Sequence, residues 1–115
     1  MPSETTHLTQ ARHNETFFDH IDAGLFGDWA VTTLFYAALH YVDAYLATQG
    51  VHPKGHVFRD MEVVKYGKTR TIHAHYRRLE DRSSDARYDA ASISATEVDT
   101  LKTGDFDPLK KVLTT

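Results

Sequence analysis

The chain has 115 residues, 41% of them apolar and 25% charged, which is the size and balance of one ordinary globular domain. Its formal net charge of −3 argues against a broad basic face for nucleic acid. It contains no cysteine, which excludes a disulfide framework, a thiolate nucleophile and a cysteine-ligated zinc ion. Residues 1–14 are polar and unlike a signal peptide, and we therefore expect a cytoplasmic protein.

Apolar residues recur at three- and four-residue steps along most of the chain, and this spacing predicts an all-α protein, a bundle of four to five helices. The first helix is expected over residues 9–23, with a stripe made of Leu8, Ala11, Phe18, Ile21 and Leu25. Gly24 suits the left-handed residue that ends a helix. Asp28 suits the N-cap of the next helix, because its carboxylate can accept bonds from free backbone N–H groups.

Residues 29–48 form the second predicted helix, which is apolar nearly all round. Such a helix is normally enclosed by others, so Trp29 and Phe35 are assigned to the core. His40 and Asp43 interrupt the apolar run, and we interpret it as a core helix rather than a membrane span, with no membrane association expected. Gly50 ends the helix and leads into a polar loop.

Two further helices are expected over residues 57–65 and 70–88. The shorter helix places Val57, Met61 and Val64 on one face, and Gly67 is expected to end it. Thr69 is expected to cap the longer helix. The inward stripe of the longer helix comprises Ile72, Tyr76, Leu79, Ser83 and Ala86.

The C-terminal part is expected to be helical as well. Ser94 and Glu97 have the spacing of a capping box, which predicts a helix over residues 95–102. Asp107 and Pro108 predict the start of a final turn, because the fixed φ of proline suits the first helical position. No segment alternates apolar and polar residues with a period of two, so no β-sheet is expected.

Three stretches, in this order, resemble the HEPN superfamily of prokaryotic helical domains. The stretch from Trp29 to His40, which ends in the pattern aromatic-Ala-Ala-x-His, is similar to the family's second helix. The loop 50–56, with its Pro, Gly and His, is similar to a loop of the family. Leu79-x6-Ala86-Arg87-Tyr88 resembles its leucine and Ala-Arg-Tyr segment at a helix end. The likeness covers roughly residues 15–112.

This resemblance implies an antiparallel helical bundle that forms a homodimer. Some members of the family are metal-independent ribonucleases, often toxins or defence effectors. Others act beside a nucleotidyltransferase-like partner or bind nucleotides without catalysis. The resemblance therefore implies RNA or a nucleotide as ligand, without a cofactor or a metal, and leaves a catalytic and a non-catalytic interpretation open.

The catalytic interpretation rests on Arg70 and His75, which match the family's pattern of Arg, four to six residues, then His. A histidine can take the proton of an RNA 2′-OH, and an arginine can hold phosphate oxygens and offset charge in the transition state. Thr71 departs from the residue that usually follows this arginine. Chance gives roughly 1.5 such pairs in a chain with this many Arg and His, so a capped, solvated helix start is the alternative interpretation.

Further candidates lie on the two longest helices. Tyr36, His40 and Asp43 share one face of the central helix, where His40 is a candidate second catalytic residue; the alternative is a buried histidine satisfied by its two neighbours. Arg77, Arg87 and Tyr36 are candidate substrate- or phosphate-binding residues, the alternative being a solvated face of weak ion pairs. Four histidines lack the spacing of a metal site, and no metal is expected: His52, His56, His73 and His75.

Overall fold

The computed structural model describes residues 2–115, in which seven α-helices and one π-helical turn follow one another and no strand occurs. The elements are α1 (Glu4–His20), α2 (Gly27–Thr48), α3 (His56–Val63), α4 (Gly67–Thr71), α5 (His73–Tyr88), α6 (Ala95–Leu101), the π-helical turn η1 (Lys102–Phe106) and α7 (Asp107–Leu113). The predicted all-α class is confirmed. The helical segments are more numerous than the four to five predicted, because short helices and breaks divide the C-terminal two thirds of the chain.

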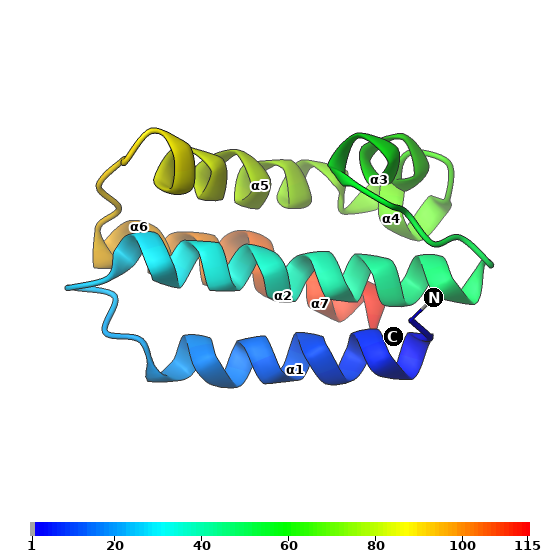
Figure 1. The fold of residues 1–115 in the computed structure, drawn as a ribbon, viewed down its shortest axis with the longest axis horizontal. Helices are drawn as coiled ribbons and strands as arrows, with labels where there is room; N and C mark the ends of the chain where they lie inside the picture. Colours follow the sequence, from blue (N-terminus) through cyan, green and yellow to red (C-terminus); the bar gives the residue numbers. More distant parts are fainter. Residues whose placement is uncertain (1) are drawn as a thin grey trace.

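Helix α2 lies in the middle of the bundle, as Figure 1 shows. Helices α1 and α5 run antiparallel to it on opposite sides, and α6, η1 and α7 form a nearly continuous rod against a third side. Helices α3 and α4 lie together at one end, between α2 and α5 in the chain. The enclosure of α2 is confirmed by fully buried core residues on several of its sides: Val31, Leu34, Phe35, Ala38, Val42 and Leu46.

The assignment of Trp29 to the core was wrong, because 59% of this residue is exposed. It lies in the first turn of α2, at the end of the bundle, beside the last residues of α5, which ends at Tyr88. Phe35, two turns further along α2, is completely buried as predicted. The apolar pattern of a helix therefore indicates which residues can be buried, whereas the length of its neighbours decides which of them are.

The first helix is longer and ends earlier than predicted. Helix α1 begins at Glu4 because the side chain of Ser3 caps it, accepting the N–H of Thr6 at 3.2 Å. It ends at His20, so that Leu25 lies beyond the helix and is exposed instead of joining the stripe. Gly24 does not end the helix; it follows Asp22, whose carboxylate accepts the N–H of Gly24 at 2.9 Å in the connecting loop.

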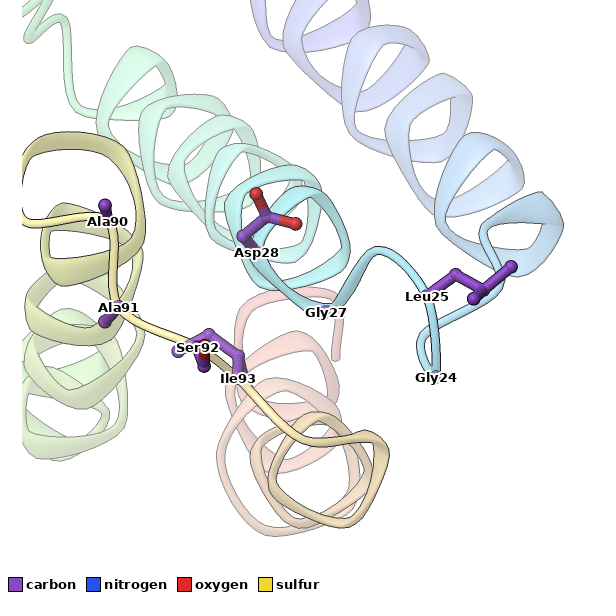
Figure 2. Close-up of a pocket in the computed structure, with 8 residues that line it drawn as sticks. All are labelled: Gly24, Leu25, Gly27, Asp28, Ala90, Ala91, Ser92 and Ile93. Atoms are coloured by element: carbon purple, nitrogen blue, oxygen red, sulfur yellow. The ribbon is translucent and has the colours of Figure 1, made fainter.

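Helix α2 begins without the cap predicted for it. Its N-cap residue is Phe26, which makes no capping bond through its side chain, and Asp28 lies inside the first turn. At this point Gly27 packs directly on the loop before α6, as Figure 2 shows. An added Cβ at Gly27 would lie 2.0 Å from the carbonyl oxygen of Ile93, so only glycine permits this approach of α2 to the loop.

The predicted helix over residues 70–88 is divided in two. Gly67 begins α4 instead of ending α3, and Ile72 separates α4 from α5. Thr69 is not an N-cap but a buried residue inside α4, where its hydroxyl donates to the carbonyl of Val63 at 2.5 Å. That bond ties α4 to the end of α3. The inward stripe predicted for α5 is confirmed, since four of its members are buried and Ala86 packs partly buried against the core.

Helix α3 has its apolar face directed outward. Val57, Met61 and Val64 share one face as predicted, but all three are exposed. Two charged residues of the same segment, Arg59 and Glu62, are buried instead. This reversal of the usual amphipathic pattern distinguishes α3 from the other helices.

The C-terminal predictions agree with the structure at two caps. Ser94 caps α6 by accepting the N–H of Glu97 at 3.1 Å, and Pro108 lies at the start of α7. Helix α7 is not a separate turn, however, because η1 connects it to α6 without a break in the helical backbone. Within residues 2–115, no helix has the combination of length and apolar content needed to cross a bilayer.

The contact at Gly27 gives a stability prediction. Gly27→Ala should lower the free energy of unfolding by about 1–3 kcal/mol, because the new methyl group displaces the backbone at Ile93. Gly104→Ala is the matched control, since nothing lies within 4 Å of a Cβ built there. Urea denaturation of both variants measures the difference, and equal stability of the two would show that the contact at Ile93 is not tight.

Candidate functional site

A histidine, a carboxylate and an arginine come together around His75, at the start of α5. The Nδ1 atom of His75 lies 2.8 Å from Oδ1 of Asp105, which comes from η1. Arg78 donates through Nε to the same carboxylate oxygen at 2.7 Å. Asp105 is 6% exposed, whereas the side chain of His75 is 28% exposed, so the carboxylate is buried beneath an imidazole that reaches solvent.

The hydrogen bonds at Asp105 fix the tautomer of a neutral His75. The Nη2 atom of Arg78 lies 3.1 Å from Nδ1 of His75, and because a guanidinium can only donate, this contact is a hydrogen bond only when Nδ1 carries no proton. In that tautomer, however, Nδ1 would face the carboxylate of Asp105 at 2.8 Å with no hydrogen between them. Asp105 is an acceptor, so Nδ1 of His75 must carry the proton that it donates. The other ring nitrogen, Nε2, is then left with a free lone pair. This is the orientation of a general base held by a carboxylate.

Arg70 lies near this cluster in sequence but has a different partner. It is exposed on the short helix α4, and its Nη1 donates weakly to the carbonyl of Val64 at 3.4 Å. Within residues 2–115, no hydrogen bond or ion pair joins Arg70 to His75. The arginine in direct contact with His75 is Arg78, three residues further along the same helix face.

His40 forms a pair with a histidine from α1. Its Nδ1 lies 3.0 Å from Nδ1 of His7, and the two rings are 5.3 Å apart. One Nδ1–H must donate to the other Nδ1, so at least one ring of the pair has to be neutral. Burial lowers the pKa of both residues, and the neighbouring His7 lowers that of His40 further.

The partners expected for His40 are engaged elsewhere. Asp43 forms a bidentate pair with the buried Arg59, at 2.7 Å from Nε and 2.9 Å from Nη2. Tyr36 accepts a bond of 2.6 Å from Nη1 of Arg87. Tyr36, His40 and Asp43 therefore do not form one site on α2. They make three separate contacts, one each to α5, α1 and α3.

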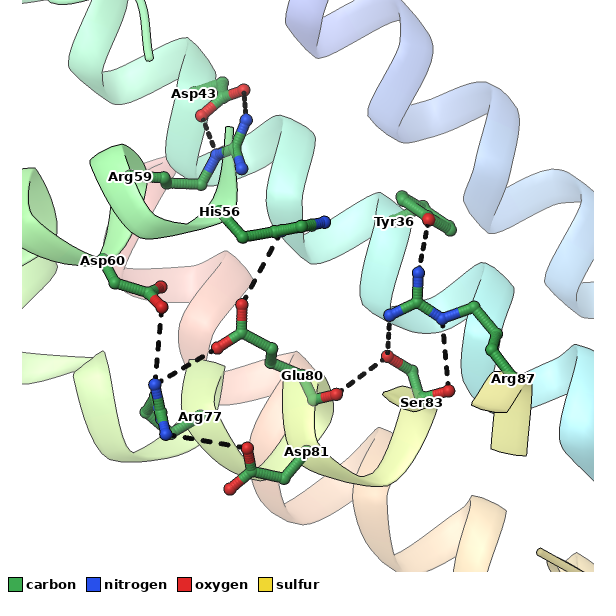
Figure 3. A network of polar contacts seen from close by, with 10 residues as sticks. All are labelled: Tyr36, Asp43, His56, Arg59, Asp60, Arg77, Glu80, Asp81, Ser83 and Arg87. Carbon is green, nitrogen blue, oxygen red and sulfur yellow. Dashed lines mark hydrogen bonds and ion pairs between the residues drawn. The ribbon is translucent and has the colours of Figure 1, made fainter. Parts of the chain in front are cut away.

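Arg87 is held at the end of α5 as a structural cation. Besides Tyr36, its guanidinium donates to the carbonyl and the hydroxyl of Ser83, at 3.2 and 3.3 Å, as Figure 3 shows. Its Cζ also lies 5.3 Å from the centre of the Tyr36 ring, a cation–π contact. Two of the residues predicted to bind phosphate thus bind each other and fix α5 against α2.

Arg77 belongs to an exposed network with three carboxylates. Its Nη1 lies 3.4 Å from both Asp60 and Glu80, and its Nη2 lies 3.7 Å from Asp81 (Figure 3). Burial raises the pKa of Glu80, and the nearby Asp60 raises it further. His56 lies 3.7 Å from Glu80, but burial and the cations Arg59 and Arg87 lower its pKa, so this contact has little ionic character at neutral pH.

Two hollows near the start of α2 differ in their chemistry. One is lined by loop residues, glycines and Asp28, and Figure 2 shows that it offers no histidine or cation. The other, of about 140 Å³, lies between the exposed Trp29 and Arg87 and is also lined by Thr32. Only the second combines an aromatic surface with a guanidinium.

The four histidines considered as metal ligands do not lie together at one site. Within the part of the chain that the structure describes, no three side chains of His, Asp or Glu are placed to hold one metal ion. His75 is bound to Asp105, His56 contacts Glu80, and Nδ1 of His52 is buried without a partner.

Three residues of these sites were not predicted from the sequence. Asp105 and His7 lie 30 and 33 positions away from the histidines that they contact. Arg78 is one of several arginines on α5, and no motif distinguishes it from the others. The usable signal was its i+3 spacing from His75, which places both residues on one helix face.

The histidine pair predicts a loss of stability in acid. A pKa lowered by folding means that the unfolded chain binds more protons below the ordinary value of 6.5, so the free energy of unfolding falls as pH decreases through that value. His7→Gln should make this decrease smaller between about pH 7.5 and about pH 5.5. The measurement is urea denaturation at both values, with His13→Gln, an exposed site on the same helix, as control. Equal slopes in the three proteins would contradict the prediction.

Comparison with known proteins gives no relative. No protein-family model, no curated protein and no solved structure matches this chain.

Proposed function

We propose that this chain is a HEPN-like domain that acts as a metal-independent endoribonuclease, with His75 as the general base. The observation that carries the proposal is the contact of 2.8 Å between His75 and the buried Asp105, which orients an imidazole that remains open to solvent. The order of the motifs that resemble the HEPN family supports the choice of RNA as substrate. The chemistry needs only a base, a cation and a substrate that carries its own nucleophile.

In the proposed reaction, Nε2 of His75 takes the proton of a 2′-OH group. The 2′ oxygen then attacks the adjacent phosphorus, the bond to the 5′ oxygen breaks, and the leaving oxygen takes up a proton from solvent. The products are a 2′,3′-cyclic phosphate and a 5′-hydroxyl end. These ends identify the mechanism, because hydrolysis by an activated water would leave a linear phosphate.

A cation beside the base would stabilise the charge that grows on the phosphate oxygens. Arg78 fits this role best, since its guanidinium contacts His75 and its side chain is 56% exposed. Arg70, exposed one turn before α5, is proposed as a second phosphate contact. His40 has no part in the proposed reaction, because its Nδ1 is already hydrogen-bonded to Nδ1 of His7.

The proposal predicts cleavage of single-stranded RNA in the presence of EDTA. His75→Ala should lower the rate by about 10²- to 10⁴-fold, the usual contribution of a general base. Arg78→Ala should also lower it, whereas His73→Ala, two residues before His75, should leave it unchanged. The rates are measured on a labelled oligonucleotide, and the ends are identified by mass spectrometry.

Two results would remove this function. Absence of cleavage in the wild type would do so, and so would wild type and His75→Ala cleaving at the same rate. A 3′-hydroxyl end together with a 5′-phosphate end would overturn the mechanism, since attack by the 2′-OH always leaves the phosphate on the 3′ side.

A second candidate function is non-catalytic nucleotide binding, favoured by the hollow between Trp29 and Arg87. An exposed tryptophan offers a stacking surface for a base, and the guanidinium of Arg87 lies beside it. In this case ATP should raise the melting temperature of the wild type but not of Trp29→Ala. The homodimer and the nucleotidyltransferase-like partner remain predictions from the family resemblance, which sedimentation and co-purification would test.

A further inference from the structure

Helix α3 presents to solvent the residues that a helix normally buries. Four apolar side chains, which we call the α3 face, are exposed by 43 to 77%: Val57, Phe58, Met61 and Val64. On the opposite side of the same helix, Arg59 is 6% and Glu62 9% exposed. Burial of the α3 face in this fold would remove more apolar surface from water, so its exposure has to be explained.

The buried ion pair of α3 holds the helix in this orientation. Arg59 is joined to Asp43 of α2 by two hydrogen bonds, at 2.7 and 2.9 Å, with both side chains more than nine-tenths buried. A rotation that turned the α3 face inward would carry Arg59 away from Asp43 and leave the buried carboxylate of Asp43 without its cation, which is strongly unfavourable. The outward direction of the α3 face is therefore fixed by the fold.

An acidic hollow borders the α3 face along α5. It has a volume of about 260 Å³ and is lined by residues of α3 and α5, among them three carboxylates, two arginines and a histidine: Asp60, Glu80, Asp81, Arg77, Arg87 and His56. Arg87 is bonded to Tyr36 and Ser83 rather than to a carboxylate. His56 and Asp60 come from α3 itself (Figure 3), so the hollow borders the helix that carries the apolar residues.

The carboxylates of the hollow are not fully neutralised. Arg77 is shared among Asp60, Glu80 and Asp81 at distances of 3.4, 3.4 and 3.7 Å, which are longer than those of a strong ion pair. Oδ1 of Asp60 is buried and has no hydrogen-bond partner. A further cation placed in the hollow would reduce the repulsion among the carboxylates.

We propose that the α3 face and the acidic hollow together bind a segment of another protein that carries apolar side chains next to a lysine or arginine. The apolar side chains would cover Val57, Phe58, Met61 and Val64, and the basic side chain would enter the hollow between Asp60 and Asp81. Binding of an amphipathic helix through such spaced anchors is a common mode of peptide recognition.

Charge favours a different protein over a second copy of this chain. In a two-fold dimer built on the α3 face, each partner offers the other the same apolar stripe and the same carboxylates, because such an interface pairs a surface with itself. The chain also has a net charge of −3, which adds repulsion. A basic segment meets the same surface with opposite charge.

The test is selection of random peptides of about 16 residues, displayed on phage, against the whole protein. Peptides with apolar residues beside Lys or Arg should be enriched. Met61→Asp should weaken the binding of the best peptide by about tenfold or more, since it places a charge in the centre of the contact. Asp81→Lys should weaken it as well, and salt should have the same effect on the wild type.

Leu25→Asp is the matched control, since Leu25 is also an exposed apolar residue but lies in the loop between α1 and α2. This variant should bind the peptide as tightly as the wild type does. Failure to enrich any peptide, enrichment of peptides without cations, or binding that Met61→Asp leaves unchanged would each overturn the proposal. A wild-type dimer that Met61→Asp dissociates would overturn it too, because the α3 face would then belong to a second copy. RNA cleavage by Met61→Asp at the wild-type rate would separate this surface from the proposed ribonuclease site.

Discussion

The enclosure of α2 is the constraint on which the rest of the structure depends. Most of this helix is buried, and it is covered by α1, by α5 and by the rod of α6, η1 and α7. Because α5 turns Tyr76 and Leu79 toward α2, His75 and Arg78 come to lie beside η1. The position of the proposed catalytic residues is thus a consequence of how the core is packed.

Polar contacts then fix how each outer element is turned against its neighbours. Asp43 and Arg59 hold α3, Arg82 and Glu97 join α5 to α6 at 2.6 Å, and Asp105 joins η1 to α5. The bond from Arg82 lowers the pKa of Glu97, as expected for a carboxylate that gains a cation. A buried pair contributes orientation more than net stability, since desolvation offsets much of its attraction. In this protein that orientation places an imidazole over a carboxylate and turns an apolar helix face to solvent.

The sequence predicts the parts of this fold that depend on local pattern. The central helix, the inward stripe of α5 and the Ser94 cap all follow from spacing within a few residues. It does not predict that His75 meets Asp105, because that contact joins residues 30 positions apart and depends on the π-helical turn that carries the aspartate. Periodicity also identifies the apolar face of α3 without indicating its direction, which the distant Asp43 decides. The burial of Trp29 was overestimated for a similar reason, since the pattern of α2 does not indicate where the neighbouring helix α5 ends.

The central claim is that Asp105 holds His75 with its proton on Nδ1 and its Nε2 free to act as a base. Nitrogen-15 NMR of the imidazole measures this directly, since the chemical shifts of the two ring nitrogens distinguish the tautomers of a neutral histidine. We expect the Nδ1–H form in the wild type and a shift toward the Nε2–H form in Asp105→Asn. A wild-type His75 in the Nε2–H form, or a spectrum that Asp105→Asn leaves unchanged, would contradict the account.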